Sequence, residues 1–412
     1  MIVALLVPYF PPDSNQSALM YGALAEDLVA QGCEVIVVTA QPHYSSAAAR
    51  TTVKPWSVTK TRHATIVRTF VPPLNRASIW SRLLVTLSYN WFGALWLLFH
   101  KRPDVAFMPN PAYLCAGVAA VAIVKRARLH YRIHDLYPDI AIRLGLIQSK
   151  STIGRVLGRL EALACSRAEC VTVVTEAFQT ALRDRGWGSN KVTVIPDWVD
   201  TQAIRPGKRK NLFSRQHGLD DKCVLMYGGN VGLSQGLEVL LDAADRLRRR
   251  DDIVILIIGD GAGKRRLVEE QRRRGLNNVR FLPSQSLDAL REVYASADIG
   301  FVSLLPGVAP EWCPAKVYTT MASGRPVLAA TGVDGSEASR IVQRFDCGVC
   351  VPSGDAAALA GAVVHLADSP ATRARLGAQG RAAAEAHFSR AACTLALFQM
   401  CVSSLSKAAP VS

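Results

Sequence analysis

Two glycine-rich loops in the second half of this sequence each follow a strand-like apolar run and precede a helical pattern. They are Gly228–Gly236 and Gly259–Gly263. Glycines let backbone N–H groups approach a ligand closely, and the N-terminus of a following helix favours an anion. Both loops therefore predict a phosphate site. A tight turn without a ligand is the alternative for the first loop, and in the second loop Asp260 could instead cap the helix.

A third segment, Glu311–Pro326, places a lysine where a helix should begin. Pro314 suits the first helical position and Gly324 the residue after the last one, which predicts a helix of about ten residues. A lysine in the first turn opposes the helix dipole unless an anion neutralises its charge. Lys316 therefore indicates a bound phosphate, and a solvated surface lysine is the alternative.

The predicted helix after Pro314 has two chemically different faces. We expect its apolar face to pack inward and its polar face, headed by Glu311, to look toward a cleft between two domains. The polar face consists of Lys316, Thr319, Thr320 and Ser323, and the apolar face of Val317, Tyr318, Met321 and Ala322.

In the first half of the sequence, His134 and Asp135 end an apolar run, and we expect them to point toward the same cleft. The loop after the first apolar run, Tyr9–Ser17, is polar and lacks glycine. A dinucleotide-binding fold would carry G-x-G-x-x-G at that position. The sequence therefore argues against an NAD- or FAD-dependent oxidoreductase.

Strand-like apolar runs alternate with helix-like stretches almost throughout the chain. Continuously apolar strands are typical of parallel sheets covered on both faces, and two series of them indicate two doubly wound α/β domains. Ligands bind beyond the carboxyl ends of such strands, where the loops above lie. The predicted strands are Ile2–Val7, Glu34–Ala40, Val105–Pro109, Leu129–His134, Cys170–Thr175, Val192–Pro196, Val224–Gly228, Ile253–Gly259, Val279–Leu282, Ile299–Ser303, Pro326–Ala329 and Gly348–Pro352.

A polar, basic segment around Asp200–Arg215 has no apolar period and predicts the linker between the domains. We place an N-terminal domain at 1–205 and a C-terminal domain at 206–385. The alanine-rich stretch Ala371–Leu405 reads as helix, and we expect its end, within 386–412, to cross back to the N-terminal domain.

The composition fits a folded protein of two domains. The chain has 412 residues, half of them hydrophobic, which allows two sizeable cores and argues against long disorder. Its ten cysteines lack the paired spacing of zinc sites. Cys347 and Cys350 form a single C-x-x-C without a second pair, so we expect reduced thiols rather than a metal or redox site. The N-terminus has no basic region before its apolar run, which argues against a secretory signal. We expect a cytoplasmic protein.

The charge is unevenly distributed. The chain carries a net charge of +15, and the stretch between Glu34 and Asp104 contains no acidic residue. A field of one sign favours a polyanionic partner, either nucleic acid or anionic lipid. Its basic residues are Arg50, Lys54, Lys60, Arg62, Arg68, Arg76, Arg82, Lys101 and Arg102.

Residues 79–99, within this basic stretch, are the most hydrophobic part of the chain. We expect a helix that packs on the domain and partly enters the membrane surface, because the charge-free run is borderline for a bilayer span. An ordinary buried helix is the alternative. Basic residues beside tryptophan and leucine fit anionic lipid better than nucleic acid, for which no motif is present. The apolar stripe comprises Trp80, Leu84, Leu87, Trp91, Leu95 and Leu98.

Taken together, these motifs resemble the GT-B glycosyltransferases, in particular the retaining family four. Within that family the chain is similar to the branch with colanic-acid and O-antigen fucosyl- and N-acetylfucosaminyltransferases. The resemblance implies two Rossmann-like domains that face each other across a cleft. Its landmarks are Tyr9–Pro12, Val192–Asp200, Tyr227–Leu237, Gly259–Gly261, Phe281–Ala297 and Glu311–Pro326.

The resemblance also implies roles for single residues. Glu311 matches the first glutamate of the family's E-x7-E motif, which contacts the donor sugar, but Thr319 replaces the ribose-binding second glutamate. The family's basic pair should fall near Asn230 and Gln235, neither of which is basic, so Lys316 becomes the substitute on the diphosphate.

The remaining site residues follow from the same resemblance. Catalysis is expected from Glu311, Lys316, His134 and Asp135, and the acceptor side from Ser14, Asn15, Gln16 and His43. Donor contacts are expected from Gly229, Asn230, Gln235, Gly259, Gly261, Pro283, Ser284, Gln285, Tyr318 and Thr319.

The function implied is transfer of a sugar, such as a deoxy- or N-acetylamino-hexose, from a nucleoside-diphosphate sugar to a glycan or polyprenyl-diphosphate-linked acceptor. No metal cofactor is required if Lys316 and backbone N–H groups stabilise the leaving phosphate. The protein would work at the inner face of the cell membrane, bound to anionic lipid through residues 50–102. A GT-B nucleotide-sugar 2-epimerase and a non-catalytic nucleotide-binding scaffold are the alternatives. The missing basic pair and Thr319 are the best support for the scaffold.

Overall fold

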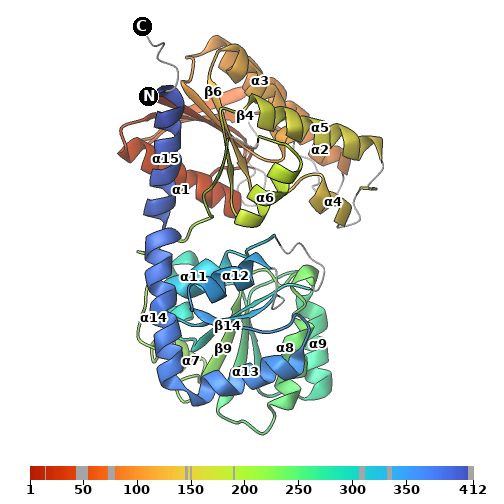
Figure 1. Cartoon of the computed structure of the whole chain (residues 1–412), viewed down its shortest axis with the longest axis vertical. Helices are drawn as coiled ribbons and strands as arrows, with labels where there is room; N and C mark the ends of the chain where they lie inside the picture. The colour runs from red at the N-terminus through yellow and green to blue at the C-terminus, as the bar shows by residue number, and fades with distance from the viewer. Residues whose placement is uncertain are drawn as a thin grey trace. The chain divides into compact units, whose positions relative to one another are not determined.

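The computed structural model describes residues 1–13, 15–42, 54–72, 79–143, 147–148, 151–188, 191–305, 311–331 and 336–406. Ser14, His43, Arg50 and Arg76 lie outside these ranges. The chain forms two compact units (Figure 1). Unit 1 comprises Met1–Pro196 together with Thr394–Ser412, and unit 2 comprises Asp197–Cys393. The predicted α/β class with two doubly wound sheets is confirmed.

The described part of unit 1 contains an eight-stranded sheet in the order β3-β4-β2-β1-β5-β6-β7-β8. Neighbouring strands are parallel except for β3, which pairs antiparallel with β4. The strands are β1 (Ile2–Leu6), β2 (Glu34–Ala40), β3 (Trp56–Lys60), β4 (Thr65–Thr69), β5 (Val105–Pro109), β6 (Arg128–Ile133), β7 (Cys170–Val173) and β8 (Val192–Val194).

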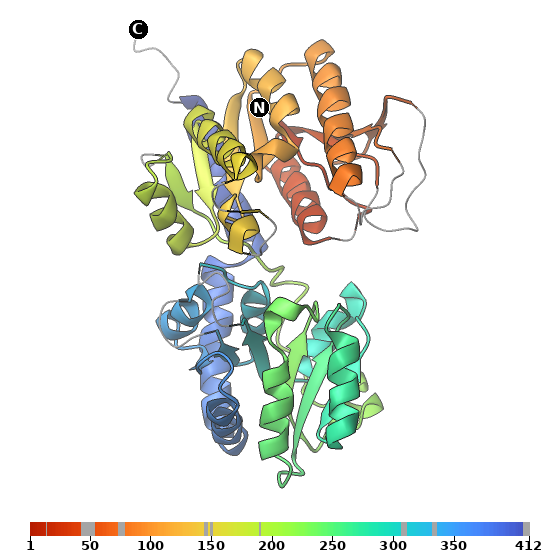
Figure 2. The ribbon, with the colours of Figure 1, turned by 90° about the vertical axis from the view of Figure 1, so that its right-hand side faces the viewer.

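Helices cover both faces of this sheet (Figures 1 and 2). On one face, Tyr21 of α1 contacts Phe107, and Cys401 of α15 lies beside His130. On the other face, α2 packs on α3, and Glu161 of α5 accepts a hydrogen bond from Tyr131. The helices of unit 1 are α1 (Gln16–Ala30), α2 (Ile79–Phe99), α3 (Ala116–Val124), α4 (Asp139–Arg143), α5 (Thr152–Arg167) and α6 (Glu176–Asp184), with the 3-10 turn η1 (Ala112–Leu114).

The hairpin of β3 and β4 is an element that the sequence analysis missed. Thr61 and Ala64 close its turn, since each backbone N–H reaches the other residue's oxygen at 2.9 Å. β3 lies at the edge of the sheet and is mostly exposed, and in both strands polar residues break the apolar run. The hairpin also takes Arg68 out of the basic surface, because its Nη2 donates to the Pro11 carbonyl at 2.6 Å.

Unit 2 contains a parallel sheet of six described strands in the order β11-β10-β9-β12-β13-β14. The strands are β9 (Cys223–Gly228), β10 (Ile253–Ile258), β11 (Val279–Leu282), β12 (Ile299–Ser303), β13 (Val327–Ala330) and β14 (Gly348–Cys350). Its helices are α7 (Leu212–Gln216), α8 (Glu238–Arg246), α9 (Lys264–Arg274), α10 (Leu290–Ala295), α11 (Lys316–Ala322), α12 (Glu337–Arg344), α13 (Ala356–Asp368) and α14 (Pro370–His387), with the turns η2 (Leu233–Gln235) and η3 (Leu287–Ala289).

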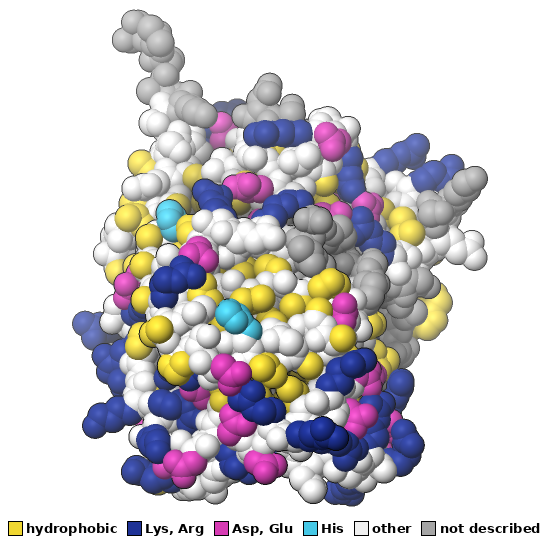
Figure 3. Space-filling model, turned by 60° about the horizontal axis from the view of Figure 1, so that its bottom comes forward, with side chains coloured by type: hydrophobic (Ala, Val, Ile, Leu, Met, Phe, Trp, Pro, Cys, Tyr) yellow, Lys and Arg dark blue, Asp and Glu magenta, His cyan; other side chains and the backbone are white. Residues whose placement is uncertain are grey.

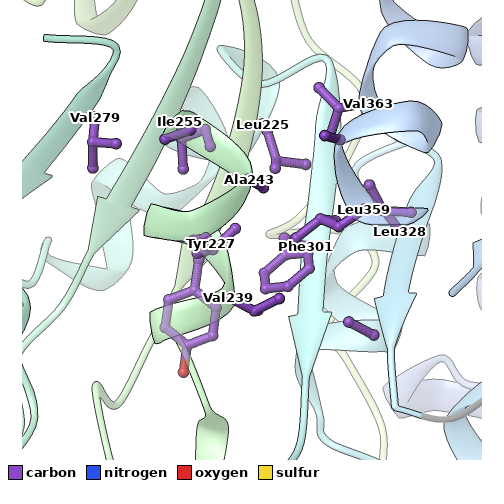
Figure 4. Packing of buried hydrophobic residues seen from close by; sticks show 14 of the residues in the cluster. Leu225, Tyr227, Val239, Ala243, Ile255, Val279, Phe301, Leu328, Leu359 and Val363 are labelled. Atoms are coloured by element: carbon purple, nitrogen blue, oxygen red, sulfur yellow. The ribbon is translucent and has the colours of Figure 1, made fainter. Parts of the chain in front are cut away.

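Apolar side chains on both faces of the strands form the core of unit 2. Leu225 and Tyr227 of β9 face α8 and α13, as Figure 4 shows, while Val224 and Met226 of the same strand pack toward α7 and α10. Successive side chains of a strand point to opposite faces, so only a continuously apolar strand can bury both. The predicted strands of this half are therefore found within one or two residues of their observed ends.

Two segments differ from their expected form. The predicted C-terminal helix is interrupted between α14 and α15 (Arg390–Ser406), because Val199 bonds to the backbone there: its N–H donates to Phe388 and its carbonyl accepts from Arg390, both at 2.9 Å. The basic segment expected as a linker is fixed to unit 2, since Arg209 Nε donates to Asp298 Oδ2 at 2.8 Å.

Acidic side chains balance much of the positive charge on unit 2. Figure 3 shows one face of the molecule, where acidic side chains lie between basic ones. Arg250 pairs with Asp252 and Asp368 in this way, and Arg274 pairs with Asp242. Exposed pairs contribute roughly 0–1 kcal/mol each to stability, so their main effect is to weaken the field of the basic excess locally.

Candidate functional site

The order of the strands in unit 2 defines where a ligand can bind. The chain runs outward from β9 through β10 to β11, then returns to place β12 on the other side of β9. Strand order therefore reverses between β9 and β12, and the loops after these two strands diverge. Such a switch point leaves a crevice at the carboxyl ends of the strands. The first glycine-rich loop follows β9, and α11 with Lys316 follows β12.

The two glycine-rich loops touch each other backbone to backbone. A Cβ atom on Gly259 would lie 1.8 Å from the Gly229 carbonyl oxygen, and Gly259 has a φ of +144°. The Val231 N–H donates to the Asp260 carbonyl at 2.9 Å, and the Gly263 N–H donates to the Val231 carbonyl at 2.9 Å. Only glycine permits this approach. The glycines at 229 and 259, expected at the donor site, thus lie side by side.

The buried Tyr227 holds the first loop in place through its hydroxyl group. Its ring is buried in the core of unit 2, and Figure 4 shows its hydroxyl oxygen pointing away from the apolar side chains. That hydroxyl donates to the Asn230 carbonyl at 2.6 Å and lies 3.3 Å from Gln235 Oε1. The helix expected directly after this loop is present, since α8 begins at Glu238 with Leu237 as its N-cap, and the short turn η2 lies within the loop itself.

Lys316 reaches into the same loop. Its Nζ donates to Gln235 Oε1 at 3.3 Å and lies 5.0 Å from the centre of the Tyr227 ring. A Cβ on Gly229 would lie 3.1 Å from Lys316 Cε. Burial lowers the pKa of Lys316 to about 8. The alternative of a solvated surface lysine is therefore wrong, and a desolvated cation lies beside the backbone of the glycine loop.

This arrangement suits a phosphate chemically. A partly desolvated ammonium group interacts with an anion more strongly than it would in water, and an anion bound beside it would raise its pKa again. Donor affinity should therefore depend on the protonation of Lys316.

We expect donor affinity to fall as pH rises from about 7 to 9, because Lys316 loses its proton as pH passes its pKa of about 8. Titration calorimetry with a nucleoside diphosphate at several pH values measures this change. Lys316→Arg keeps its charge throughout the range and should show a flat profile. A wild-type profile as flat as that of Lys316→Arg would exclude Lys316 from the anion site.

In the second loop, the charged side chains of Lys264 and Asp260 form hydrogen bonds within unit 2. Lys264 Nζ donates to the Gly259 carbonyl at 2.7 Å and to Asp260 Oδ1 at 2.8 Å. Asp260 Oδ2 accepts from the Ser284 N–H at 3.2 Å and from its hydroxyl at 3.1 Å. Asp260 does not cap α9, whose N-cap is Gly263. This loop thus joins the Pro283–Gln285 segment to the first loop, and the hydrogen bonds of Lys264 stabilise this contact.

The polar face predicted for α11 is wrong for Thr320 and Ser323, which are buried. Thr320 covers Gly300 of β12, where a Cβ would lie 2.3 Å from Thr320 Cγ2, and Ser323 Oγ donates to the Thr320 carbonyl at 2.7 Å. Small hydroxyl side chains can be buried once their hydrogen bond is satisfied within the helix. Lys316 and Thr319 remain partly accessible.

The other expected donor residues around α11 lie as follows. Glu311 is half buried just before the helix, and Thr319 Oγ1 donates to the Ala315 carbonyl at 3.1 Å. Tyr318 is buried, with its ring 4.6 Å from that of Phe388. Its side chain therefore holds α11 in place. Gln285 Nε2 donates to the Pro283 carbonyl at 2.8 Å, which shapes that turn.

In unit 1, two residues that the sequence analysis missed position His134 and Asp135. Tyr21 of α1 has its hydroxyl 3.1 Å from His134 Nε2. Asn110 accepts from the His134 N–H at 2.8 Å and donates from its side chain to the Asp135 carbonyl. A signal was available, because Asn110 directly follows β5 as His134 directly follows β6, and strands that are consecutive in the sequence usually lie side by side.

The loop after β1 contains two further expected acceptor residues. Asn15 caps α1, since its Oδ1 accepts from the Ala18 N–H at 2.7 Å, and Gln16 is exposed in the first turn. Ser14 and His43 lie outside the described residues. Across the described ranges, no group of three or more His, Cys, Asp or Glu side chains is arranged to hold a metal ion. All ten cysteines are free thiols.

Two Rossmann-like α/β units in one chain are the GT-B architecture, and the candidate anion site lies at the switch point of the second unit. Solved structures of this fold are similar over nearly the whole chain. Sucrose-phosphate synthase from Thermosynechococcus elongatus has a TM-score of 0.75 at 19% identity, with 99% of this chain and 100% of that one covered. The Anabaena protein Alr3699/HepE in complex with UDP has a TM-score of 0.73 at 17% identity, with 98% and 100% covered.

Sequence comparisons agree with the fold. Residues 21–203 match the family described as Glycosyltransferase Family 4, and residues 222–369 match Glycosyl transferases group 1. WcaI of Escherichia coli (strain K12), named for colanic acid biosynthesis, is 29% identical over 327 residues, or 76% of this chain and 79% of WcaI. WbjE of Pseudomonas aeruginosa, named as a glycosyltransferase, is 26% identical over 262 residues, or 63% of this chain and 65% of WbjE. Both halves of the chain thus match glycosyltransferase models, which supports a GT-B glycosyltransferase of family four.

Proposed function

We propose that this glycosyltransferase moves a hexose-type sugar, such as a deoxy- or N-acetylamino-hexose, from a nucleoside diphosphate to a polysaccharide or lipid-linked oligosaccharide. The observation that carries the proposal is Lys316, which lies desolvated against the glycine loop with Nζ 3.3 Å from Gln235 Oε1. The named roles of WcaI in colanic acid biosynthesis support a polysaccharide product.

The chemistry needs positive charge where negative charge grows. As the bond to the sugar breaks, charge accumulates on the leaving diphosphate, and preorganised donors lower that barrier. Lys316 Nζ would supply such a donor without a metal. Backbone N–H groups of the Gly229–Gln235 loop would add others, apart from those of Gly229, Val231 and Gln235, which donate to carbonyls within unit 2. We propose retention of configuration, with the departing phosphate accepting the proton of the attacking hydroxyl. Product analysis by NMR of the anomeric proton tests this stereochemistry.

The donor is tested by a thermal-shift screen of UDP, GDP, ADP and their sugar forms, followed by product analysis with the sugar that stabilises the protein. UDP is the first candidate, because the Anabaena protein Alr3699/HepE has been solved with UDP and with UDP-glucose. We expect a rise in Tm with one base and transfer of its sugar to an acceptor. Free nucleotide sugar with an inverted C2 centre would instead identify an epimerase. Binding without turnover would support the scaffold.

We also propose that α2 attaches the protein to an anionic membrane surface at the cytoplasmic face. Tyr89, Gly93 and Trp96 of this helix are buried against the sheet and α3. On the opposite side, six of the apolar side chains are between 44% and 74% exposed, which is unusual for side chains of this size. They are Trp80, Leu83, Leu84, Leu87, Trp91 and Leu98. Among the described helices, none combines the length and apolarity needed to cross a bilayer.

Liposome flotation tests this attachment. We expect the wild type to float with vesicles containing phosphatidylglycerol in low salt, and Trp80→Glu with Trp91→Glu to remain in solution. Both tryptophans are at least 70% exposed, so the substitutions should leave the fold intact. Leu287→Glu, at a 65% exposed position in unit 2, is the matched control and should float. A wild type that stays in solution would refute the attachment.

A further inference from the structure

Unit 1 has a second switch point, at the end of the sheet where the expected residues Asn15, His134 and Asp135 also lie. The chain runs outward from β1 through β2 to β4, then returns to place β5 on the other side of β1. Strand order therefore reverses between β1 and β5, which leaves a crevice at the carboxyl ends of these strands. In unit 2 the equivalent position holds the glycine loop and Lys316.

A tyrosine lies in the loop after each of three adjacent strands at this position. Tyr9 follows β1, Tyr113 follows β5 and Tyr137 follows β6, and β1, β5 and β6 are consecutive in the sheet. All three are partly buried and partly accessible. Burial raises the pKa of Tyr113, and the phenol of Tyr113 also interacts electrostatically with that of Tyr9. Burial likewise raises the pKa of Tyr137 to about 12, and Tyr137 interacts electrostatically with Tyr113. The three phenols thus form one cluster.

The loops that carry the tyrosines are held rigidly. Glu161 of α5 is buried, and its Oε1 accepts from the Ala112 N–H at 2.7 Å, next to Tyr113. Asn110 joins the loops after β5 and β6 through its bonds to His134 and Asp135. A site whose supporting backbone is fixed loses less entropy when a ligand binds.

A cation and an apolar surface adjoin this cluster. Arg82, in the first turns of α2, is exposed and interacts electrostatically with Tyr113. Trp80, Leu83 and Leu84 flank Arg82 in the same helix and are exposed by 44–74%. The tyrosine cluster, Arg82 and the exposed apolar side chains of α2 are therefore arranged in this order, from the end of the sheet to the outer face of α2.

We propose that Tyr9, Tyr113, Tyr137 and Arg82 form the subsite for the head group of a lipid-linked acceptor. The tyrosines contact its sugar, Arg82 contacts its diphosphate, and the start of α2 contacts its lipid. This assignment rests on the proposed transferase function and specifies its acceptor as a diphosphate-linked sugar. It places the acceptor on residues other than the expected Asn15 and Gln16.

Each part of the site matches the chemistry of one part of this ligand. A tyrosine presents an apolar ring and a hydroxyl, which suits a sugar with its apolar C–H faces and hydroxyl groups. An arginine binds phosphate oxygens through two parallel N–H donors, which a neutral side chain cannot replace. A hydrocarbon chain that leaves the diphosphate would continue along the exposed leucines of α2.

The test is a titration of the full chain with farnesyl diphosphate and with the same compound carrying one N-acetylglucosamine. It is performed with the donor nucleotide at saturation, so that the site in unit 2 is occupied. We expect both probes to bind and the sugar-bearing probe to bind at least tenfold more tightly. Arg82→Gln should weaken both at least tenfold, and Arg82→Lys should recover part of the loss. Tyr113→Ala should remove the advantage of the sugar.

Arg183→Gln is the matched control, because Arg183 is exposed on α6, which packs on β7 and β8 away from α2. It should bind both probes as the wild type does. Displacement of the probe by nucleotide, or unchanged binding by Arg82→Gln and Tyr113→Ala, would overturn this assignment. A wild type that binds no nucleotide at all would instead refute the proposed transferase, so the two failures are distinguishable. Nucleotide-induced rise in Tm shows that each variant is folded.

Discussion

Lys316→Ala is expected to lower kcat/KM for the donor sugar by about 10²–10³-fold while the protein remains folded. Removal of one preorganised donor to a developing anion has an effect of this size. The loop at Gly229–Gln235 lacks basic side chains, so the diphosphate would lose its charged partner in unit 2. Initial-rate kinetics with the donor identified in the thermal-shift screen measure the loss.

Removal of the Lys316 charge by Lys316→Met should leave stability unharmed, and this separates a binding role from a structural one. The pKa of Lys316 is depressed in the folded state, to about 8 from 10.5. Below about pH 8 the lysine is charged in both states, and burial of that charge disfavours folding; stability recovers as pH rises through 8 toward 10.5, where the unfolded state binds more protons. Lys316→Met should therefore melt at or above the wild-type Tm at pH 7.

Lys210→Ala serves as the control, because Lys210 forms an exposed pair with Asp221 at 3.0 Å. It should retain wild-type kinetics. If Lys316→Ala turns over the donor as fast as Lys210→Ala does, Lys316 does not stabilise the leaving group, and the proposed mechanism fails.

Gly259→Ala is expected to destabilise unit 2 by roughly 3–5 kcal/mol and to abolish donor binding. The new Cβ would lie 1.8 Å from the Gly229 carbonyl oxygen, and the φ of +144° is one that an alanine rarely adopts. Because the clash is with backbone, the two glycine loops must separate, which also displaces Gly229 from Lys316. Thermal melting and nucleotide titration of the variant measure both effects.

Gly361→Ala is the matched glycine control. Gly361 lies within α13, and a Cβ there meets nothing within 4 Å. Alanine favours a helix over glycine by about 1 kcal/mol, so this variant should be as stable as the wild type or more so, with unchanged binding. A Gly259→Ala protein that melts and binds like Gly361→Ala would show that the loops do not need their close approach.

The sequence predicted the central strands well because burial on both faces leaves a continuous apolar run. β2, β5 and β12 have the predicted bounds. The edge strand β3 and its neighbour β4 went undetected, since β3 is mostly exposed and polar residues interrupt the apolar pattern of both strands. The missed break before Arg390 has a different origin: the bonds that interrupt the helix come from Val199, and no local signal reports a partner so far along the chain.

For the candidate site, the sequence singled out the two glycine loops and Lys316 but did not show that they contact each other. Lys316 and Gln235 are 81 positions apart, and their hydrogen bond exists because the strand order places β12 beside β9. The burial of Thr320 also depends on a residue that is distant in the sequence. Its hydroxyl predicted an accessible face, but the side chain is buried in the space that Gly300 of β12 leaves open.

By itself, the sequence determined the two series of parallel strands, the glycine turns that permit close backbone approach, and the first-turn position of Lys316, because these depend on local patterns and on the conformational freedom of single residues. Tertiary structure alone decided which loops share a switch point, and therefore that Lys316 faces Gly229. It also decided that the apolar stripe of α2 is exposed, because Tyr89, Gly93 and Trp96 already occupy the side that packs on the sheet.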